Sequence, residues 1–317
     1  MKKYIALSLL ALMGWGCLPA RQPSATADAD STEECQAPCL DVSVPVSYTR
    51  EDSLFVCRVL QEAKRTKDTG TLFFARKFIN QPYVAHTLEV FDDERLVVNT
   101  RELDCTTLVE NVVALTLCAR QGKTSFNDFT RILKTLRYRN GELNEYPSRL
   151  HYYSDWIIDK QRMGFVTEIQ APNPPFTAVQ ELKIDYMSQH PTAYKALKAH
   201  PEYVSVIRSQ EQALTGKQFR YIPKSQVRKL NTRDMRQTVQ DGDILCITTN
   251  IKGLDIAHLG FAVWKADGLH LLNASMIHKK VEEDPTLFRE YIQQRASFTG
   301  IRVVRLNNVN AKLITKN

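Results

Sequence analysis

The sequence predicts an α+β fold, with helices in the first part of the chain and an antiparallel sheet in the last third. Downstream of Cys105, apolar residues recur at helical spacing, so that Leu108, Val112 and Leu115 share one face of an amphipathic helix. After residue 240, short runs of alternating apolar residues are separated by turns that contain Asp and Gly. Helices and strands that are segregated along the chain are typical of the α+β class.

The remaining elements follow in chain order from the same patterns. Helices are expected over 52–64, 71–78, 105–120 and 125–136, and over 191–213 with a break near His200 and Pro201. Extended segments are expected over 83–84, 86–90 and 95–99, and sheet strands over 244–248, 257–264, 269–275 and 302–306. The proline-rich stretch 171–176 is expected to be a loop or an edge segment, and a helical segment around 161–236 is expected as an insertion in the main domain.

Composition excludes some classes of protein. The chain has 317 residues, 43% of them hydrophobic and 24% charged, which is ordinary for a globular protein. The net charge of +7 would suit nucleic acid, but the lysines and arginines are scattered and form no basic cluster interleaved with aromatic residues. We therefore expect no nucleic-acid partner. An anionic envelope or cell-wall surface explains the positive excess equally well.

The N-terminus indicates export. Two lysines precede an apolar run over residues 4–15, which has the length of a signal-peptide core and is too short to span a bilayer. The run ends in small residues before Cys17, which resembles a bacterial lipobox. We expect residues 1–17 to be a lipoprotein signal peptide and the protein to be periplasmic, anchored to the membrane through a lipid at Cys17. The alternative is cleavage after Ala20 or Ala27, which would give a soluble periplasmic protein.

A tether is expected to follow the signal peptide. Residues 18–45 are rich in Ala, Ser, Thr, Asp and Pro and hold few large apolar residues, so they are expected to link the membrane to the domain 46–317. The seven cysteines are odd in number and irregularly spaced, and they define no disulfide framework. Pairing of Cys35 with Cys39 or Cys57 stays open.

Cys105 is the candidate nucleophile because it stands at a predicted helix start. Asp104 suits the N-cap, which leaves Cys105 at the first helical position. The helix dipole favours a thiolate there, and a basic partner would lower the thiol pKa further. The alternative for this cysteine is a buried core residue, as we expect for Cys118 and Cys246 in their apolar runs.

The predicted strands supply a base and an orienting group. In 257–264, alternation places His258 on the face that carries small neighbours. In 269–275, Asn273 lies on one face with Leu271, and the hairpin turn brings it near His258. Cysteine, histidine and a polar residue are the three parts of papain-type nucleophilic catalysis. Cys105 would attack an amide carbonyl, His258 would carry the proton and Asn273 would hold the imidazole.

Other parts of the site are suggested by composition. The stretch 146–156 is dense in aromatic and hydrogen-bonding side chains, which suits stacking on sugar or peptide, although the same residues could pack on the core. His86 and His151 are further candidates for substrate contacts. The backbone N–H of Cys105, at the helix start, is a candidate oxyanion donor. The sequence has no HExxH motif, paired Cys/His spacing or phosphate-binding glycine loop, so no metal or cofactor is expected.

Several separated motifs carry a resemblance to a known family. The segments RELDCTTLVE, PSRLHYYSDW, DGDIL, GLDIAHLGFAVW and HLLNAS resemble the NlpC-type clan of papain-like cell-wall hydrolases. Their closest likeness is to its N-acetylmuramoyl-L-alanine amidase-like branch, which is common in Bacteroidetes. The resemblance runs from about 73 to 306 and implies an α+β papain-like fold. It implies that Cys105 is the nucleophile, His258 the base and Asn273 the orienting residue, a position that is more often histidine in the wider clan.

The resemblance also implies a substrate. The branch cleaves the amide between N-acetylmuramic acid and L-alanine in peptidoglycan fragments, with 1,6-anhydro-muropeptides as the expected substrates. One alternative is the clan's commoner activity, a γ-D-glutamyl-diaminopimelate endopeptidase, and another is a lipoprotein that binds muropeptides without cleaving them. The substrate-binding candidates are Tyr83, Asp104, Arg149, His151, Tyr152 and Asp155.

Overall fold

The structure is a computed structural model that describes residues 45–229 and 232–308. The predicted signal peptide with Cys17, the tether up to residue 44 and the cysteines at 35 and 39 lie outside the described residues. Among the helices of the described ranges, none is both long enough and apolar enough to cross a membrane.

The first part of the described chain is helical, as predicted. Its helices are α1 (Arg50–Thr66), α2 (Thr71–Arg76), α3 (Cys105–Arg120), α4 (Phe126–Arg137) and α5 (Tyr153–Arg162). Two short strands, β1 (Val46–Ser47) and β2 (Leu96–Val97), pair in parallel beside them. The segment 86–90, predicted to be extended, instead forms a turn closed by a bond from the N–H of Glu89 to the carbonyl of His86. His86 has a φ of 63°, which is incompatible with a strand.

The second part is built on an antiparallel sheet. The strands are β3 (Val166–Ile169), β4 (Ala178–Glu181), β5 (Gln218–Pro223), β6 (Ile244–Thr249), β7 (Ile256–Trp264), β8 (Leu269–Ser275), β9 (Lys280–Glu283) and β10 (Phe298–Leu306). Their order is β4-β5-β10-β6-β7-β8-β9, and β3 also pairs with β10. Every one of these pairings is antiparallel. The prediction of a mixed α+β fold with a late antiparallel sheet is confirmed.

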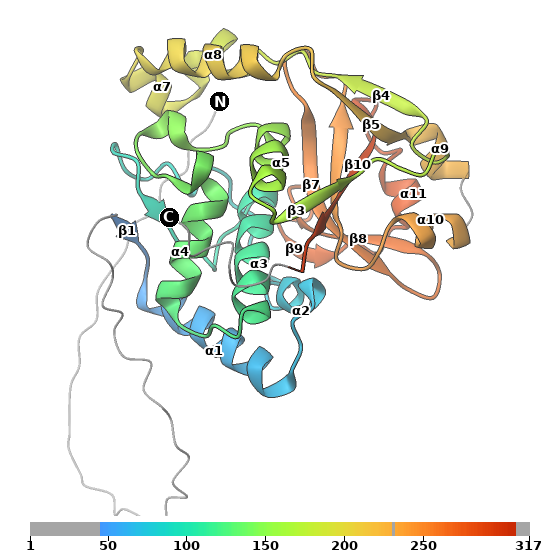
Figure 1. The fold of residues 1–317 in the computed structure, drawn as a ribbon, viewed down its shortest axis with the longest axis horizontal. Coiled ribbons are helices and arrows are strands. Elements are labelled where there is room, and N and C mark those ends of the chain that lie inside the picture. The colour runs from blue at the N-terminus through green and yellow to red at the C-terminus, as the bar shows by residue number, and fades with distance from the viewer. Residues whose placement is uncertain (1–44, 230–231, 309–317) are drawn as a thin grey trace, which may run out of the picture. The chain divides into compact units, whose positions relative to one another are not determined.

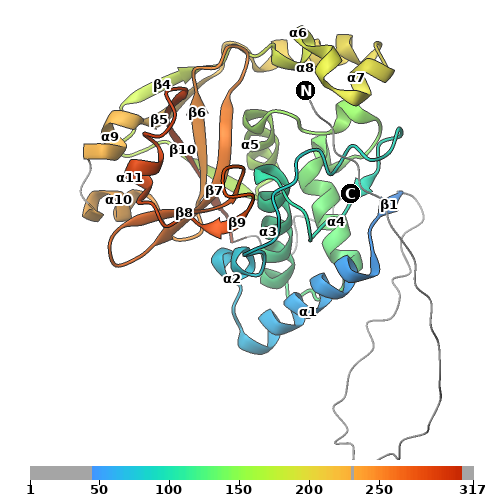
Figure 2. The ribbon, with the colours of Figure 1, turned by 180° about the vertical axis from the view of Figure 1, so that it is seen from behind.

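Helix α3 lies between the sheet and α4 in both Figure 1 and Figure 2. Leu259, Phe261 and Val263 of β7 face this helical layer and belong to the same core as α3. Ala262, on the alternate face, belongs to a second core on the other side of the sheet. The predicted alternation of β7 is therefore confirmed. Helices α9 (Lys224–Lys229), α10 (Thr232–Thr238) and α11 (Phe288–Tyr291) lie near that second core.

The helix α3 departs from its prediction in one respect. The sequence pattern predicted an amphipathic helix with one solvent-facing side, but all its residues from Thr107 to Cys118 are buried. Its polar residues are buried because α4 covers that side and supplies Arg137, which pairs with Glu110 at 2.7 Å. The core assignments of Cys118 and Cys246 are confirmed, since both are fully buried.

A third group of elements lies beyond the end of α5 (Figure 1). It contains α6 (Tyr186–Gln189), α7 (Lys195–Ala199) and α8 (Tyr203–Leu214), which contact the short 3-10 turns η2 (Tyr146–Ser148) and η3 (Pro191–Ala193). A further 3-10 turn, η1 (Arg139–Gly141), lies against α4 and α5. The predicted break near His200 is confirmed. The segment 161–236 is not purely helical, however, because β3, β4 and β5 fall within it and extend the sheet. These strands were missed because their alternation is short and largely exposed.

Candidate active site

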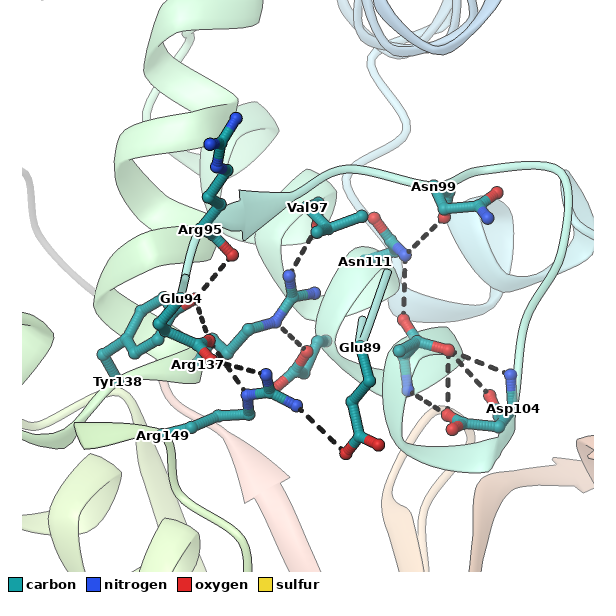
Figure 3. A network of polar contacts seen from close by, with 12 residues as sticks. Glu89, Glu94, Arg95, Val97, Asn99, Asp104, Asn111, Arg137, Tyr138 and Arg149 are labelled. Carbon is teal, nitrogen blue, oxygen red and sulfur yellow. Dashed lines mark hydrogen bonds and ion pairs between the residues drawn. The ribbon is translucent and has the colours of Figure 1, made fainter. Parts of the chain in front are cut away.

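Cys105 occupies the first position of α3, as predicted. Asp104 is the N-cap, and its Oδ1 accepts hydrogen bonds from the backbone N–H and the hydroxyl of Thr107, each at 2.8 Å. The Thr107 hydroxyl in turn accepts the N–H of Asp104 at 2.9 Å, which completes a capping box (Figure 3). Asp104 was a candidate for substrate binding, but its carboxylate is engaged in holding the helix start.

His258 and Asn273 meet across neighbouring strands. His258 Nε2 lies 3.0 Å from Asn273 Oδ1. The amide of Asn273 is oriented by its own Nδ2, which donates to the carbonyl of Leu271 at 3.5 Å. Since Oδ1 can only accept, Nε2 must carry the ring proton, and the lone pair of the neutral imidazole then lies on Nδ1. Asn273 is fully buried, so this arrangement is shielded from water.

One cavity of about 250 Å³ brings the predicted groups together. Cys105 and His258 both line it, and the backbone N–H of Leu259, the residue after His258, hydrogen-bonds the Cys105 sulfur. The other lining residues are Glu89, Thr106, Tyr146, Leu150, His151, Tyr152, Tyr153, Trp156, Met187, Tyr194, Leu254, Asp255, Ile256 and Ala257. The thiol and the imidazole therefore face the same half-enclosed space.

The charge state of the thiol differs from the expectation. Burial raises the pKa of Cys105 to about 12, and the neighbouring Asp104 carboxylate acts in the same direction. Burial also lowers the pKa of His258. The hydrogen bond to Asn273 acts in the opposite direction, because it favours the protonated ring, but its effect is smaller. The sequence predicted a thiolate from the helix dipole and a basic partner, and neither of these includes the effect of burial on the thiol pKa. In the folded chain desolvation is the larger effect, so a neutral thiol faces a neutral imidazole.

Two further predicted residues, His151 and Tyr152, line the same cavity. His151 Nε2 lies 3.0 Å from the carbonyl oxygen of Tyr146, and burial lowers the pKa of His151 to about 3, so its ring is neutral. The Tyr152 hydroxyl donates to Glu211 at 2.7 Å and accepts the N–H of Met187 at 2.9 Å. This hydroxyl therefore fixes α8 against the site, while the ring forms part of the wall.

Arg149 and Asp155 do not line this cavity. The Arg149 guanidinium binds both oxygens of Glu94, at 3.0 and 2.6 Å (Figure 3). Asp155 binds Arg139 in the same two-pronged manner, at 3.1 and 2.5 Å. Both side chains are buried and their charges are paired. Asp155 lines neither this cavity nor the neighbouring one, so its position does not support a contact with substrate. Arg149 lines the neighbouring cavity, and its contact with substrate stays a prediction.

Tyr83 and His86 lie elsewhere as well. Tyr83 forms a bridge to Leu103 beside the helix start, and burial raises the pKa of its hydroxyl, with Cys105 and Asp104 acting in the same direction. It is close to the nucleophile but is not part of the cavity wall. The side chain of His86 is 72% exposed at the surface.

The structure places in the cavity several groups that the sequence pattern did not distinguish. The hydroxyls of Tyr146 and Tyr153 and the indole nitrogen of Trp156 are buried and have no hydrogen-bond partner among the described residues. Their stretch was noted for its aromatic density, but nothing in that signal distinguished these three side chains. Glu89 could not be found from the sequence, because only folding brings its turn to the cavity.

One group of side chains in the described ranges could offer three metal ligands. Atoms of His278, Glu282 and Asp284 lie within 4.8 Å of one another. His278 is already hydrogen-bonded to Glu282, and Asp284 accepts the N–H of Thr286 at 2.8 Å. These partners account for the cluster without a metal, and it is separate from the cavity wall.

Comparisons with known proteins agree with this architecture. A family model described as N-acetylmuramoyl-L-alanine amidase-like (AmiA-like) matches residues 73–301. No curated protein sequence matches the chain. The crystal structure of an N-acetylmuramoyl-L-alanine amidase from Bacteroides uniformis is 40% identical, with a TM-score of 0.71, and the match covers 76% of this chain and 100% of that chain.

Two other solved structures are similar to this chain, at very different levels of sequence identity. A Bacteroides fragilis protein, named only provisionally as a xylanase, is 43% identical with a TM-score of 0.68, and the match covers 73% of this chain and 98% of that chain. A Legionella pneumophila protein of the family DUF1460 is 18% identical with a TM-score of 0.62, over 80% of this chain and 96% of that chain. At that identity the second likeness shows a shared fold alone.

Proposed function

The chain belongs to the N-acetylmuramoyl-L-alanine amidase-like family, and from this membership we propose that it is a cysteine amidase of papain-like, NlpC-type architecture. It cleaves the amide bond between N-acetylmuramic acid and L-alanine in peptidoglycan fragments. The observation that carries the proposal is the shared cavity of Cys105 and His258, with His258 held by Asn273 at 3.0 Å.

The proposed mechanism follows from the neutral pair. As the Cys105 sulfur bonds to the amide carbon, His258 Nδ1 takes the thiol proton. The backbone N–H of Cys105, which has no partner within its own helix, faces the developing oxyanion. The imidazolium then protonates the alanine nitrogen, the C–N bond breaks, and the peptide leaves with a free amine. A water molecule then attacks the thioester carbon while Nδ1 takes one of its protons. The C–S bond breaks, the acid product leaves, and the imidazolium returns the proton to the sulfur.

The pH dependence tests the neutral pair. His258 must be neutral to accept the thiol proton, and its pKa lies below the ordinary 6.5. Activity should therefore fall only below pH 6.5 and stay level through the alkaline range up to about pH 9, because the thiol pKa is about 12. The measurement is kcat/KM against pH. A loss of activity starting near pH 8 would instead indicate a preformed thiolate–imidazolium pair, which fails when the imidazolium loses its proton.

Replacing Asn273 tests the orienting role. Asn273→Ala removes the acceptor that fixes the ring proton on Nε2, and we expect kcat to drop by about 10²- to 10⁴-fold, the range of a general acid–base contribution. Asn273→His offers an alternative acceptor and should recover part of this loss. Thermal unfolding of both variants separates this effect from a packing defect, since Asn273 is fully buried. Full activity in Asn273→Ala would refute the role.

Product identity tests the bond that is cleaved. The protein is incubated with a 1,6-anhydro-disaccharide tetrapeptide, and the fragments are identified by mass. Free disaccharide and free tetrapeptide are expected. A cut after D-glutamate would instead indicate the endopeptidase, and intact substrate would indicate a binding protein. Intact sacculi and xylan serve as comparison substrates, and release of xylose sugars would favour the activity for which the Bacteroides fragilis structure is named.

Export and lipid anchoring are proposed on the sequence alone. Residues 1–17 would be removed as a signal peptide and the new N-terminus at Cys17 would carry the lipid, so that the enzyme works at the periplasmic membrane surface. Mass spectrometry of the mature N-terminus tests this. An unmodified N-terminus beyond Cys17 would show ordinary cleavage.

A further inference from the structure

A second cavity adjoins the one that holds Cys105 and His258. It has a volume of about 420 Å³ and shares Glu89 and Tyr146 with the first. Asp92, Asp93, Glu94, Glu145 and Arg149 also line it. Because Glu89 and Tyr146 separate the two cavities by no more than their own side chains, groups attached to an amide at Cys105 lie next to the second cavity.

The second cavity is acidic, but most of its carboxylates already have cationic partners. The pairs are Glu94 with Arg149 at 2.6 Å, Asp92 with Lys195 at 3.0 Å and Asp93 with Arg95 at 2.7 Å. These pairs contribute little net charge to the cavity.

Two carboxylates lack a cationic partner of their own. Glu89 pairs with Arg149 at 3.8 Å, but the same guanidinium already binds both oxygens of Glu94, so one cation serves two carboxylates (Figure 3). Glu145 accepts a hydrogen bond from the Tyr203 hydroxyl and has no cationic partner among the described residues. The group of Glu89, Glu94 and Arg149 therefore keeps one net negative charge, and the exposed Glu145 adds a second at the same cavity, so the cavity attracts a cation.

Tyr146 adds a buried polar atom at the junction of the cavities. The residue is only 4% exposed, yet its hydroxyl has no hydrogen-bond partner in the described part of the chain. Burial raises the pKa of this hydroxyl, and the charge of Glu89 raises it further. Tyr146 and Glu89 both line the two cavities. A buried hydroxyl without a partner is destabilising by itself, so this oxygen is a hydrogen-bonding group that the described part of the protein leaves unused.

We propose that this second cavity binds a primary ammonium group of the substrate's peptide, held by Glu89, Glu145 and the hydroxyl of Tyr146. An ammonium group has three donors and no acceptor, and two carboxylates with one hydroxyl oxygen supply three acceptors. A sugar hydroxyl donates to a carboxylate but does not neutralise its charge, whereas an ammonium group does both. The inference rests on the proposed amidase function, under which the ammonium belongs to a diamino acid in the stem peptide.

Two matched substrates test the proposal. One is a disaccharide carrying L-Ala-γ-D-Glu-L-Lys, and the other is the same compound with the lysine amine acetylated. The wild-type protein should show a kcat/KM about 10- to 100-fold higher for the free amine, the size of a charge-assisted hydrogen bond. Glu89→Gln and Tyr146→Phe should bring this ratio close to one. Tyr146→Phe removes an oxygen without a protein partner, so it should fold normally.

The matched control is Asp93→Asn, which alters a carboxylate on the same wall that is already paired with Arg95. In this variant, the ratio of kcat/KM for the free-amine substrate to kcat/KM for the acetylated substrate should stay at the wild-type value. Equal rates for the two substrates in the wild type would overturn the proposal, and so would an unchanged ratio in Glu89→Gln. The proposal would also be overturned if Glu89→Gln lowered kcat/KM equally for the free-amine and the acetylated substrate. That result would place the sugar, which the two substrates share, in this cavity.

A binding measurement keeps the inference separate from the amidase activity. Calorimetry with the Cys105→Ser protein and the free tripeptide L-Ala-γ-D-Glu-L-Lys, or its acetylated form, requires no turnover. If the wild type cleaves neither disaccharide compound, the amidase proposal fails. Tighter binding of the free amine by about tenfold or more would still support the ammonium site, whereas equal binding would overturn it.

Discussion

Cys105→Ser is expected to abolish amide hydrolysis, with a loss in kcat of about 10⁴-fold or more. A serine hydroxyl at this position is a far weaker nucleophile than a thiol, and the neutral His258 in the same cavity is too weak a base to activate it efficiently. The fold should be retained because the substitution is nearly isosteric and Asp104 still caps the helix. Hydrolysis of the 1,6-anhydro-disaccharide tetrapeptide, followed by mass, is the measurement.

Cys118→Ala is the matched control for this experiment. Cys118 lies on the same helix, fully buried and away from the cavity. Its replacement should destabilise the protein by about 1–2 kcal/mol and leave the rate per folded molecule at the wild-type level. If Cys105→Ser retained turnover, or if the two variants lost activity equally, the nucleophile would have to be assigned elsewhere.

Glu110→Ala is expected to destabilise the protein by about 3–5 kcal/mol, because it leaves the charge of Arg137 buried without its partner. Glu110 lies on α3, and Arg137, at the end of α4, donates to it at 2.7 Å and to the carbonyl of Val97 at 2.5 Å (Figure 3). The two side chains are only 4% and 2% exposed, so little water can replace the lost contact. The free energy of unfolding in urea, measured by circular dichroism, tests the prediction.

The control for Glu110→Ala is an ion pair at the surface. Arg76 and Glu283 lie 2.8 Å apart, with Arg76 half exposed. Arg76→Ala should change the free energy of unfolding by no more than about 1 kcal/mol, since solvent screens exposed pairs. Similar losses in the two variants would mean that the buried pair contributes no more than an exposed one and that α3 is held by its apolar contacts alone.

The main elements around the site could be predicted from local sequence. Asp104 and Cys105 were placed at a helix start from the capping preference and the apolar spacing that follows them. The strands that carry His258 and Asn273 were predicted from alternation and a turn, and the structure joins these two residues at 3.0 Å. These features depend on neighbours within a few positions of one another, which is why the sequence alone was sufficient.

Tertiary contacts decided the rest. Folding places Glu94 against Arg149, a pairing that the sequence did not predict, and the second cavity exists only because the turn at Glu89 meets Tyr146. The expected charge of Cys105 changed from thiolate to neutral thiol for the same reason, since burial has the largest effect on its pKa.

The sequence by itself determined which groups are available and which local elements carry them. Only the tertiary structure decided which of these groups are ion-paired, which are desolvated and which line a cavity. Pairing and desolvation depend on residues that are distant along the chain.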